Sequence, residues 1–384
     1  MTVGAGMAAT PPRKASRASS WRENWLAWRV RLIANASFQR WAADNPFTRF
    51  VARRNMRALF DLCAGFVYSQ VLLACVRLDV FEAMRNGPED LVVLAERFGL
   101  DLQRARRLLL AAASLRLLRA LPDDRFALGD LGAALLGDPS IGAFVEHHRL
   151  LYDDLRDPVA LLRGETVTRL SGFWPYAAQS DVAAAEEDFA AYSTLMARSQ
   201  ELIARDLLDA HPFHAHRCLL DVGGGEGVFA AAAATRFPHI TLKLFDLPAV
   251  AARAQARLGN LGNRVEAIGG NFLRDDLPRG ADVITLLRVL HDHDDATVAK
   301  LLRAAYDALP AGGTVVIAEP FAGTPGGEPV GDAYFGMYLL AMGRGRARSA
   351  AELTALLRSA GFETVRSWPT RRPLLLGCLT ARRL

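Results

Sequence analysis

The stretch Cys218-Leu-Leu-Asp-Val-Gly-Gly-Gly-Glu-Gly227 decides the fold of this chain. Its first five residues are mainly apolar and predict a buried strand, and residues 228–236 after it predict a helix. Gly223, Gly225 and Gly227 let the backbone turn tightly and approach a ligand without a Cβ in the way. A dinucleotide-binding loop needs its last glycine where Val228 stands, so the spacing argues against NAD and FAD.

Six further apolar runs follow the first one and are separated by helix-like stretches. They cover residues 241–245, 264–268, 282–287, 314–318, 364–368 and 374–380. The last two runs are separated by a turn-length gap, which predicts an antiparallel pair at the end of the sheet. We therefore expect residues 201–384 to form a Rossmann-like α/β domain with a seven-stranded sheet that ends in an antiparallel hairpin.

The 384 residues exceed what one hydrophobic core usually serves, which favours two domains. Residues 58–200 are predicted to be mainly helical. Within them, residues 91–118 predict a helix, a turn and a second helix, and residues 124–128 predict the strand of a wing. This winged-helix pattern occurs in DNA-binding proteins, but the second helix is apolar over much of its circumference. Burial in a domain or dimer is therefore favoured, and no nucleic-acid partner is expected.

Residues 21–57 are basic and rich in tryptophan, with eight arginines against two acidic residues. Trp21, Trp25 and Trp28 recur at helical spacing and share one stripe. A basic, tryptophan-rich amphipathic helix is typical of a membrane-surface segment, and it also fits a helix packed across a dimer interface. No uninterrupted apolar run reaches about 18 residues, so no membrane-spanning segment is expected. Residues 1–20 are small and polar and predict a disordered tail.

The four cysteines lie far apart and form no CxxC pair. This usage predicts reduced thiols rather than disulfides or a zinc site, as in a cytoplasmic protein.

Two aspartates follow the first two strands of the predicted sheet. Asp246, in Phe-Asp-Leu-Pro, stands where a carboxylate can accept both hydroxyls of a ribose, and helix capping is the alternative role. Asp221 is interpreted as an acceptor of backbone N–H groups that shapes the glycine loop and contacts a cofactor.

The segment Leu290-His-Asp-His-Asp-Asp295 follows the fourth predicted strand, at the edge where open α/β sheets bind ligands. We expect His291 to be a general base for an acceptor hydroxyl, with Asp292 as its catalytic neighbour. Glu319, at the end of the fifth strand, is expected to hydrogen-bond the imidazole and fix its tautomer. Asp294 and Asp295 suit the N-cap of a following helix, so no metal ion is expected. The alternative is that His291 and Glu319 are simply polar residues at two strand ends and have no role in catalysis.

Together with Glu319 and Gly345-Arg-Ala-Arg-Ser349, these motifs resemble the plant caffeate and bacterial polyketide O-methyltransferases of the class I methyltransferase fold. The resemblance implies that residues 58–200 serve dimerisation and cover the substrate. It implies that residues 201–384 bind S-adenosylmethionine and release S-adenosylhomocysteine. The residues expected at the cofactor are Asp221, Gly223, Gly225, Gly227, Asp246, Leu247, Gly270, Asn271, Phe272 and Arg288.

Three positions depart from the pattern of that family. Ala347 stands where a second carboxylate is expected, Gly270-Asn271 where an Asp-Met pair contacts adenine, and Leu287 where a lysine is expected. The contacts to adenine and the support of the base therefore differ here from those of the family.

The segments 45–49, 60–70 and 288–293 resemble the O-methyltransferases of purple photosynthetic bacteria that methylate the tertiary 1-hydroxyl of acyclic hydroxycarotenoids. The family resemblance implies a homodimer, and a substrate dissolved in the bilayer implies that the enzyme lies peripherally on the intracytoplasmic membrane. The expected pocket for the substrate contains Tyr192, Met196, Tyr334, Met337, Tyr338 and Met342. The alternatives are a phenolic or polyketide acceptor, a winged-helix regulator, or a protein that binds S-adenosylmethionine without methylating.

Overall fold

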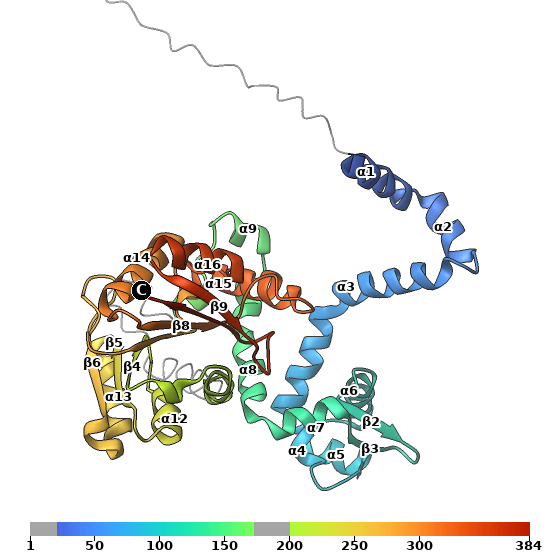
Figure 1. Cartoon of the computed structure of the whole chain (residues 1–384). Coiled ribbons are helices and arrows are strands. Elements are labelled where there is room, and N and C mark those ends of the chain that lie inside the picture. The colour runs from blue at the N-terminus through green and yellow to red at the C-terminus, as the bar shows by residue number, and fades with distance from the viewer. Residues whose placement is uncertain (1–20, 173–199) are drawn as a thin grey trace, which may run out of the picture.

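The computed structural model describes residues 21–172 and 200–384. Figure 1 shows two globular parts and a helical arm that extends away from them. The C-terminal part is built on one mixed sheet, and the smaller N-terminal part is mainly helical. The expected tail at residues 1–20 lies outside the described residues, as do Tyr192 and Met196.

The C-terminal sheet has the strand order β6-β5-β4-β7-β8-β10-β9. Strands β4 to β8 are parallel, whereas β10 runs antiparallel to both β8 and β9. The central strands are buried on both faces, which is why they read as continuous apolar runs. The strands are β4 (Cys218–Val222), β5 (Thr241–Asp246), β6 (Val265–Gly269), β7 (Val283–Leu287), β8 (Thr314–Glu319), β9 (Glu363–Trp368) and β10 (Gly377–Arg382).

This architecture confirms the predicted seven strands and the terminal hairpin. The largest difference is at the last strand, which begins at Gly377 rather than at Leu374. Leu375 and Leu376 both donate backbone hydrogen bonds to the carbonyl oxygen of Arg372, so this apolar stretch closes a turn before pairing starts.

Helices cover both faces of the sheet. One face packs against α14 (Asp295–Ala308) and α16 (Ala350–Ser359). The other face packs against α12 (Val228–Arg236), α13 (Pro248–Leu258) and residues 203–208. The short 3-10 segments η1 (Phe213–Ala215), η2 (Gly259–Arg264) and η3 (Leu290–Asp292) connect these elements. Because β4, β5 and β7 are parallel, their carboxyl ends lie at the same open edge of the sheet.

The N-terminal part has the predicted winged-helix arrangement. Its three-stranded sheet has the order β1-β3-β2, and its apolar core includes residues of α5, α6 and β3. The second helix ends earlier than expected, because Arg116 adopts a positive φ of 62° and Leu118 already pairs in the sheet. The elements are α4 (Val80–Ala83), β1 (Glu89–Asp90), α5 (Leu91–Arg97), α6 (Leu102–Ser114), β2 (Leu118–Leu121), β3 (Arg125–Leu128) and α7 (Asp130–Gly137).

A helical cap joins the two parts. Helix α8 (Pro139–Asp154) packs against α10 (Arg169–Gly172) and α15 (Gly336–Met342), and α9 (Pro158–Leu162) also contacts α15. A π-helical segment, η4 (Pro329–Phe335), leads into α15. The apolar cluster of this cap mixes residues from both parts, including Leu151, Leu161, Leu170 and Leu339. The cap therefore covers the open edge of the C-terminal sheet.

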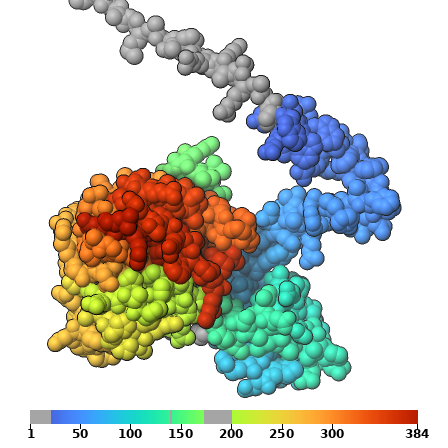
Figure 2. All heavy atoms as spheres, in the orientation of Figure 1, coloured from blue at the N-terminus to red at the C-terminus, as the bar shows by residue number. Residues whose placement is uncertain are grey.

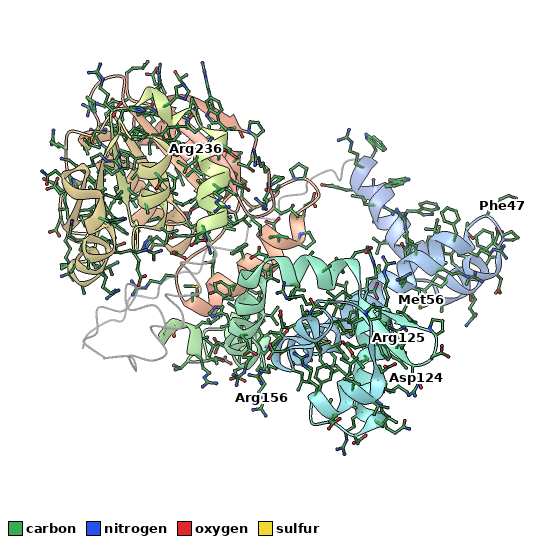
Figure 3. All side chains as sticks on the ribbon, turned by 90° about the horizontal axis from the view of Figure 1, so that it is seen from below. Phe47, Met56, Asp124, Arg125, Arg156 and Arg236 are labelled. Atoms are coloured by element: carbon green, nitrogen blue, oxygen red, sulfur yellow. The ribbon has the colours of Figure 1, made fainter. Side chains whose placement is uncertain are left out.

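The arm consists of α1 (Trp21–Ala34), α2 (Ala36–Asp44) and the first part of α3 (Arg49–Arg77). Figure 2 shows it standing clear of both globular parts, and Figure 3 shows Phe47 and Met56 on it. Trp21, Trp25 and Trp28 are at least half exposed.

Among the described residues, α3 is the one helix whose length and composition would let it cross a bilayer. The sequence expectation considered uninterrupted apolar runs, whereas this helix continues through the polar residues Ser69 and Gln70. Only Leu73 and Cys75, near the C-terminal end of α3, are buried, and Cys75 belongs to the winged-helix core. All four cysteines are free, as predicted.

Candidate active site

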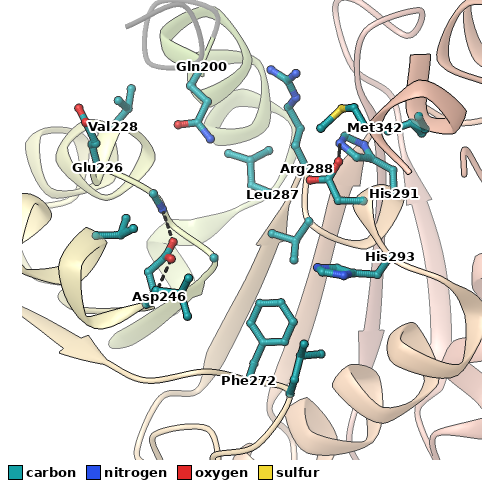
Figure 4. Close-up of a pocket in the computed structure, with 18 of the residues that line it drawn as sticks. Gln200, Glu226, Val228, Asp246, Phe272, Leu287, Arg288, His291, His293 and Met342 are labelled. Carbon is teal, nitrogen blue, oxygen red and sulfur yellow. Dashed lines mark hydrogen bonds and ion pairs between the residues drawn. The ribbon is translucent and has the colours of Figure 1, made fainter. Parts of the chain in front are cut away.

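A deep pocket lies at the carboxyl ends of β4, β5 and β7, beneath α8 and α15 (Figure 4). One side of it is formed by the glycine loop, Asp246 and residues 270–273. The other side is formed by His291 and aromatic residues of η4 and α15. The predicted residues that line it are Gly223, Gly225, Asp246, Leu247, Gly270, Asn271, Phe272, Arg288, His291, Asp292, Tyr334, Tyr338 and Met342.

The glycine loop supplies an open wall of the pocket. Gly225 has a φ of 58°, and a Cβ built on it would meet no atom within 4 Å. Gly227 also lies in the left-handed region, but it begins α12, and its Cβ would lie 2.6 Å from a methyl carbon of Leu258. Gly227 does not line the pocket and instead allows α12 to pack closely, so its contact with a cofactor stays a prediction.

Asp246 ends β5 and is held by the loop next to it. One carboxylate oxygen accepts the backbone N–H of Gly225 at 2.8 Å, and the other accepts that of Leu247 at 2.7 Å. Burial raises the pKa of Asp246, and these two hydrogen bonds oppose the rise. A carboxylate has about four acceptor positions, so this fixed group retains acceptor capacity toward a ligand.

Asp221 lies behind the loop rather than in the pocket lining. Its Oδ1 accepts the hydroxyl of Thr285 at 2.7 Å, and its Oδ2 has no hydrogen-bond partner among the described residues. The structure therefore contradicts the expectation that Asp221 accepts backbone N–H groups of the loop. Burial raises the pKa of Asp221 to about 7, although the hydrogen bond from Thr285 opposes this.

His291 lies in η3, directly after β7, and its side chain is buried. Its Nε2 is 3.3 Å from an oxygen of Asp292, and its Nδ1 is 3.8 Å from Oε2 of Glu319. The same Glu319 oxygen accepts the backbone N–H of His291 at 3.0 Å. Glu319 thus holds the backbone of the histidine, and the predicted hydrogen bond to the ring is absent. Asp292 is the carboxylate nearest to the ring.

The electrostatic surroundings of His291 favour the protonated imidazole. Burial alone would lower the pKa of His291, but the negative charges of Asp292 and Glu319 outweigh it and raise the pKa above its ordinary value. Burial raises the pKa of Glu319 as well, and the charge of His291 opposes this. This arrangement can accept a proton from a bound hydroxyl and stabilise the resulting imidazolium.

Aromatic side chains form the wall opposite the glycine loop. The ring of Phe335 stacks near His291, with centroids 6.2 Å apart, and Tyr334 stacks on Tyr338 at 5.8 Å. Met337, which the sequence also suggested for this wall, packs into the cap and does not line the pocket. Phe144 of α8 lines the pocket and was missed, because nothing in the periodicity of α8 shows which helix of the other part it meets.

Profiles of two domain families match the chain. The profile of the O-methyltransferase domain matches residues 152–363, and the profile of the O-methyltransferase dimerisation domain matches residues 60–138.

The chain belongs to the O-methyltransferase family.

Two relatives in this family are named demethylspheroidene O-methyltransferase. The protein of Cereibacter sphaeroides is 45% identical over 92% of this chain and 94% of its own length. That of Rhodobacter capsulatus is 41% identical over 88% of this chain and 85% of its own length.

Solved structures of the family have the same fold. A methyltransferase of calicheamicin biosynthesis with bound S-adenosylhomocysteine has a TM-score of 0.72 and is 26% identical; the match covers 86% of this chain and 98% of that one. Human N-acetylserotonin methyltransferase in complex with S-adenosylmethionine, at 22% identity, has a TM-score of 0.70; the match covers 86% of this chain and 97% of that one.

This O-methyltransferase uses S-adenosylmethionine as its cofactor. The pocket fits that group, because the open glycine wall leaves room against the backbone and Asp246 offers fixed acceptor oxygens. In the part of the chain that the structure describes, no group of three or more His, Cys, Asp or Glu side chains could hold a metal ion.

Proposed function

We propose that this enzyme transfers the methyl group of S-adenosylmethionine to the tertiary 1-hydroxyl of an acyclic hydroxycarotenoid, with His291 as the general base. The observation that carries this proposal is the pocket itself. It has glycines on one side, and on the other side a buried histidine beside the aromatic rings of Tyr334, Phe335 and Tyr338. The names of the two demethylspheroidene O-methyltransferases support the same substrate class.

The proposed residues act mainly by orientation. The cofactor supplies an electrophilic methyl group on its sulfonium. A tertiary alcohol is a very weak acid, so His291 cannot form a free alkoxide and instead takes the proton as the oxygen attacks. Asp292, next to Nε2, stabilises the imidazolium that forms. Glu319 holds the backbone of His291. Holding the reacting atoms in line in a dry pocket accounts for most of the rate enhancement.

The cofactor is proposed to lie along the first wall. Gly223 and Gly225 allow close approach of its amino-acid end, and Asp246 accepts from its ribose hydroxyls. Gly270, Asn271 and Phe272 then surround the adenine, while Leu247 and Arg288 complete the wall. Asp246→Ala tests this assignment. We expect the dissociation constant for S-adenosylmethionine, measured by calorimetry, to rise at least tenfold, and an unchanged constant would contradict the ribose contact.

Residues 21–57 are proposed to attach the enzyme to an anionic membrane surface. The tryptophans of α1 are exposed, and Arg22 and Arg29 lie over the rings of Trp21 and Trp25 at 5.7 and 5.6 Å. Such pairs place a positive charge beside an apolar ring, as a lipid interface requires. Replacing Trp21, Trp25 and Trp28 with serine should abolish flotation with phosphatidylglycerol vesicles. Undiminished flotation would contradict this attachment.

We also propose that residues 58–200 form a dimerisation and substrate-capping unit of a homodimer at the cytoplasmic membrane surface, and that residues 201–384 form the cofactor-binding unit. The match of the dimerisation profile supports the dimer. Light scattering of the purified protein in detergent tests it, because a monomer at micromolar concentration would contradict it.

The substrate is tested by mass spectrometry. The purified enzyme is incubated with S-adenosylmethionine and a 1-hydroxylated acyclic carotenoid in liposomes, with a phenol such as N-acetylserotonin in a parallel reaction. We expect the carotenoid to gain one methyl group at the tertiary hydroxyl. Methylation of the phenol alone would contradict the carotenoid assignment and favour the phenolic alternative.

A further inference from the structure

The turn that carries His291 is held from behind by a buried arginine. The Arg348 side chain is fully buried, immediately before the N-cap of α16. Its Nη1 donates to the carbonyl oxygen of Leu290 at 2.8 Å, and its Nη2 donates to that of His293 at 2.7 Å. These two carbonyl groups flank His291 and Asp292, so one guanidinium group bridges both ends of η3.

The same guanidinium is anchored by charge. Its Nε donates to Asp295 at 2.8 Å, at the first turn of α14. Arg346 also pairs with Asp295, at 3.0 Å, and with Glu352 at 2.8 Å. A buried charge is tolerated only where it is paired and hydrogen-bonded, and Arg348 meets both conditions.

The chain before Arg348 also contacts the turn directly. A Cβ on Gly345 would lie 2.1 Å from the carbonyl oxygen of His291. The backbone of Gly345 therefore lies against the backbone of His291 with no room for a side chain at this position. Glu319 binds the N–H of His291 from another side at 3.0 Å.

We propose that Arg348 is a positioning residue for His291, which fixes the imidazole by clamping the carbonyl groups of Leu290 and His293. This inference rests on the proposed role of His291 as the base. Arg348 does not line the pocket, so it acts on the reaction only through η3. Releasing the clamp changes the distances from the ring to Asp292 and Glu319, which set its pKa. Displacement of a catalytic group by about 1 Å can cost about 100-fold in rate.

The test compares Arg348→Met with Arg346→Met. Arg346 shares Asp295 with Arg348 but does not reach the carbonyl groups of Leu290 or His293, and it is the matched control. We expect Arg348→Met to lower kcat about 10- to 100-fold, with the dissociation constant for S-adenosylmethionine within about twofold of the wild type. The acid limb of its pH–rate profile should move, because the distances from the ring to Asp292, Glu319 and Arg288, whose charges act on the pKa of His291, are no longer fixed. Arg346→Met should change neither kcat nor the position of the acid limb.

An unchanged kcat and an unmoved acid limb in folded Arg348→Met would overturn the proposal. If that variant does not fold, Arg348→Lys decides, because lysine keeps the charge but cannot bridge two carbonyl groups. A lower kcat at an unchanged melting temperature supports the clamp, and full activity overturns it. His291→Gln is measured alongside. If it retains turnover, the base assignment fails, and the positioning role fails with it. If Arg348→Met is fully active while His291→Gln is inactive, the base assignment stands and the positioning role of Arg348 is rejected.

Discussion

A histidine beside an aspartate lies near each end of β7, and the pKa values of the two histidines are shifted in opposite directions. At the carboxyl end, burial would lower the pKa of His291, but Asp292 and Glu319 raise it. Near the amino end, His216 lies 3.2 Å from Asp282, yet burial dominates and its pKa is lowered. A histidine next to an aspartate is therefore not by itself a sign of a raised pKa.

The difference lies in the carboxylates. Asp292 and Glu319 are both buried, so their charges act on His291 through a medium of low dielectric constant. Asp282 is 37% exposed, and its oxygens also accept the backbone N–H groups of Arg217 and Cys218. His216 faces a second neutral imidazole, that of His211, at 3.2 Å. Two buried carboxylates raise the pKa of the neighbouring histidine, whereas one partly solvated carboxylate does not and mainly holds the start of a strand in place.

The largest contrast is expected from replacing the histidine at each end with glutamine. His291→Gln should reduce kcat by about 10²- to 10⁴-fold, because the positioned base is removed, while S-adenosylmethionine still binds. His216→Gln should leave kcat within about twofold of the wild type. Methyl transfer and calorimetry on both variants check this, and equal losses of activity would remove the distinction between the two ends.

The aspartate substitutions give the next largest contrast. Asp292→Asn should lower kcat about 10-fold. The neutral imidazole is the active form, so activity falls as the pH drops through its pKa. Asp292 raises that pKa, and its loss should therefore shift the acid limb of the pH–rate profile to lower pH. Asp282→Asn should leave the profile in place and lower the melting temperature, because it weakens three backbone or ring contacts. An acid limb that stays fixed in Asp292→Asn would contradict the assignment of Asp292.

The sequence predicted the strands better than the contacts at their ends. The bounds of β4 and α12 follow directly from local apolar periodicity and the glycine spacing, and the side chain of Asp294 caps α14 as expected. Two contacts of η3 come from residues far along the chain. Glu319, 28 residues after His291, accepts the backbone N–H of His291, and Arg348, 57 residues after it, forms the clamp. No local sequence pattern predicts these contacts between distant segments. Phe144 enters the pocket from the other part of the chain for the same reason.

A third prediction concerns stability at the amino end of β7. Burial lowers the pKa of His211 to about 4 from 6.5, so the unfolded state binds the proton more readily than the folded state. The buried neutral His211 therefore costs no stability above pH 6.5, and it destabilises the fold increasingly as the pH falls from about 6.5 to about 4. This loss of stability amounts to about 3 kcal/mol. Urea unfolding of His211→Gln should show a smaller loss over this range than the wild type. Identical pH dependence would contradict the buried neutral state of His211.

The smallest effect is expected in the middle of β7, where Thr285 faces Asp221 across the strand pair. The hydroxyl of Thr285 lowers the pKa of Asp221, which burial raises to about 7. Thr285→Val should therefore raise that pKa further and destabilise the fold by about 1–2 kcal/mol at pH 8. At pH 5 the carboxyl group is largely protonated in the folded state, so the cost should be smaller. Thr285→Ser keeps the hydroxyl and is the control for urea unfolding at both pH values. A cost that does not depend on pH would mean that the hydroxyl only fills space, and that burial alone sets the state of Asp221.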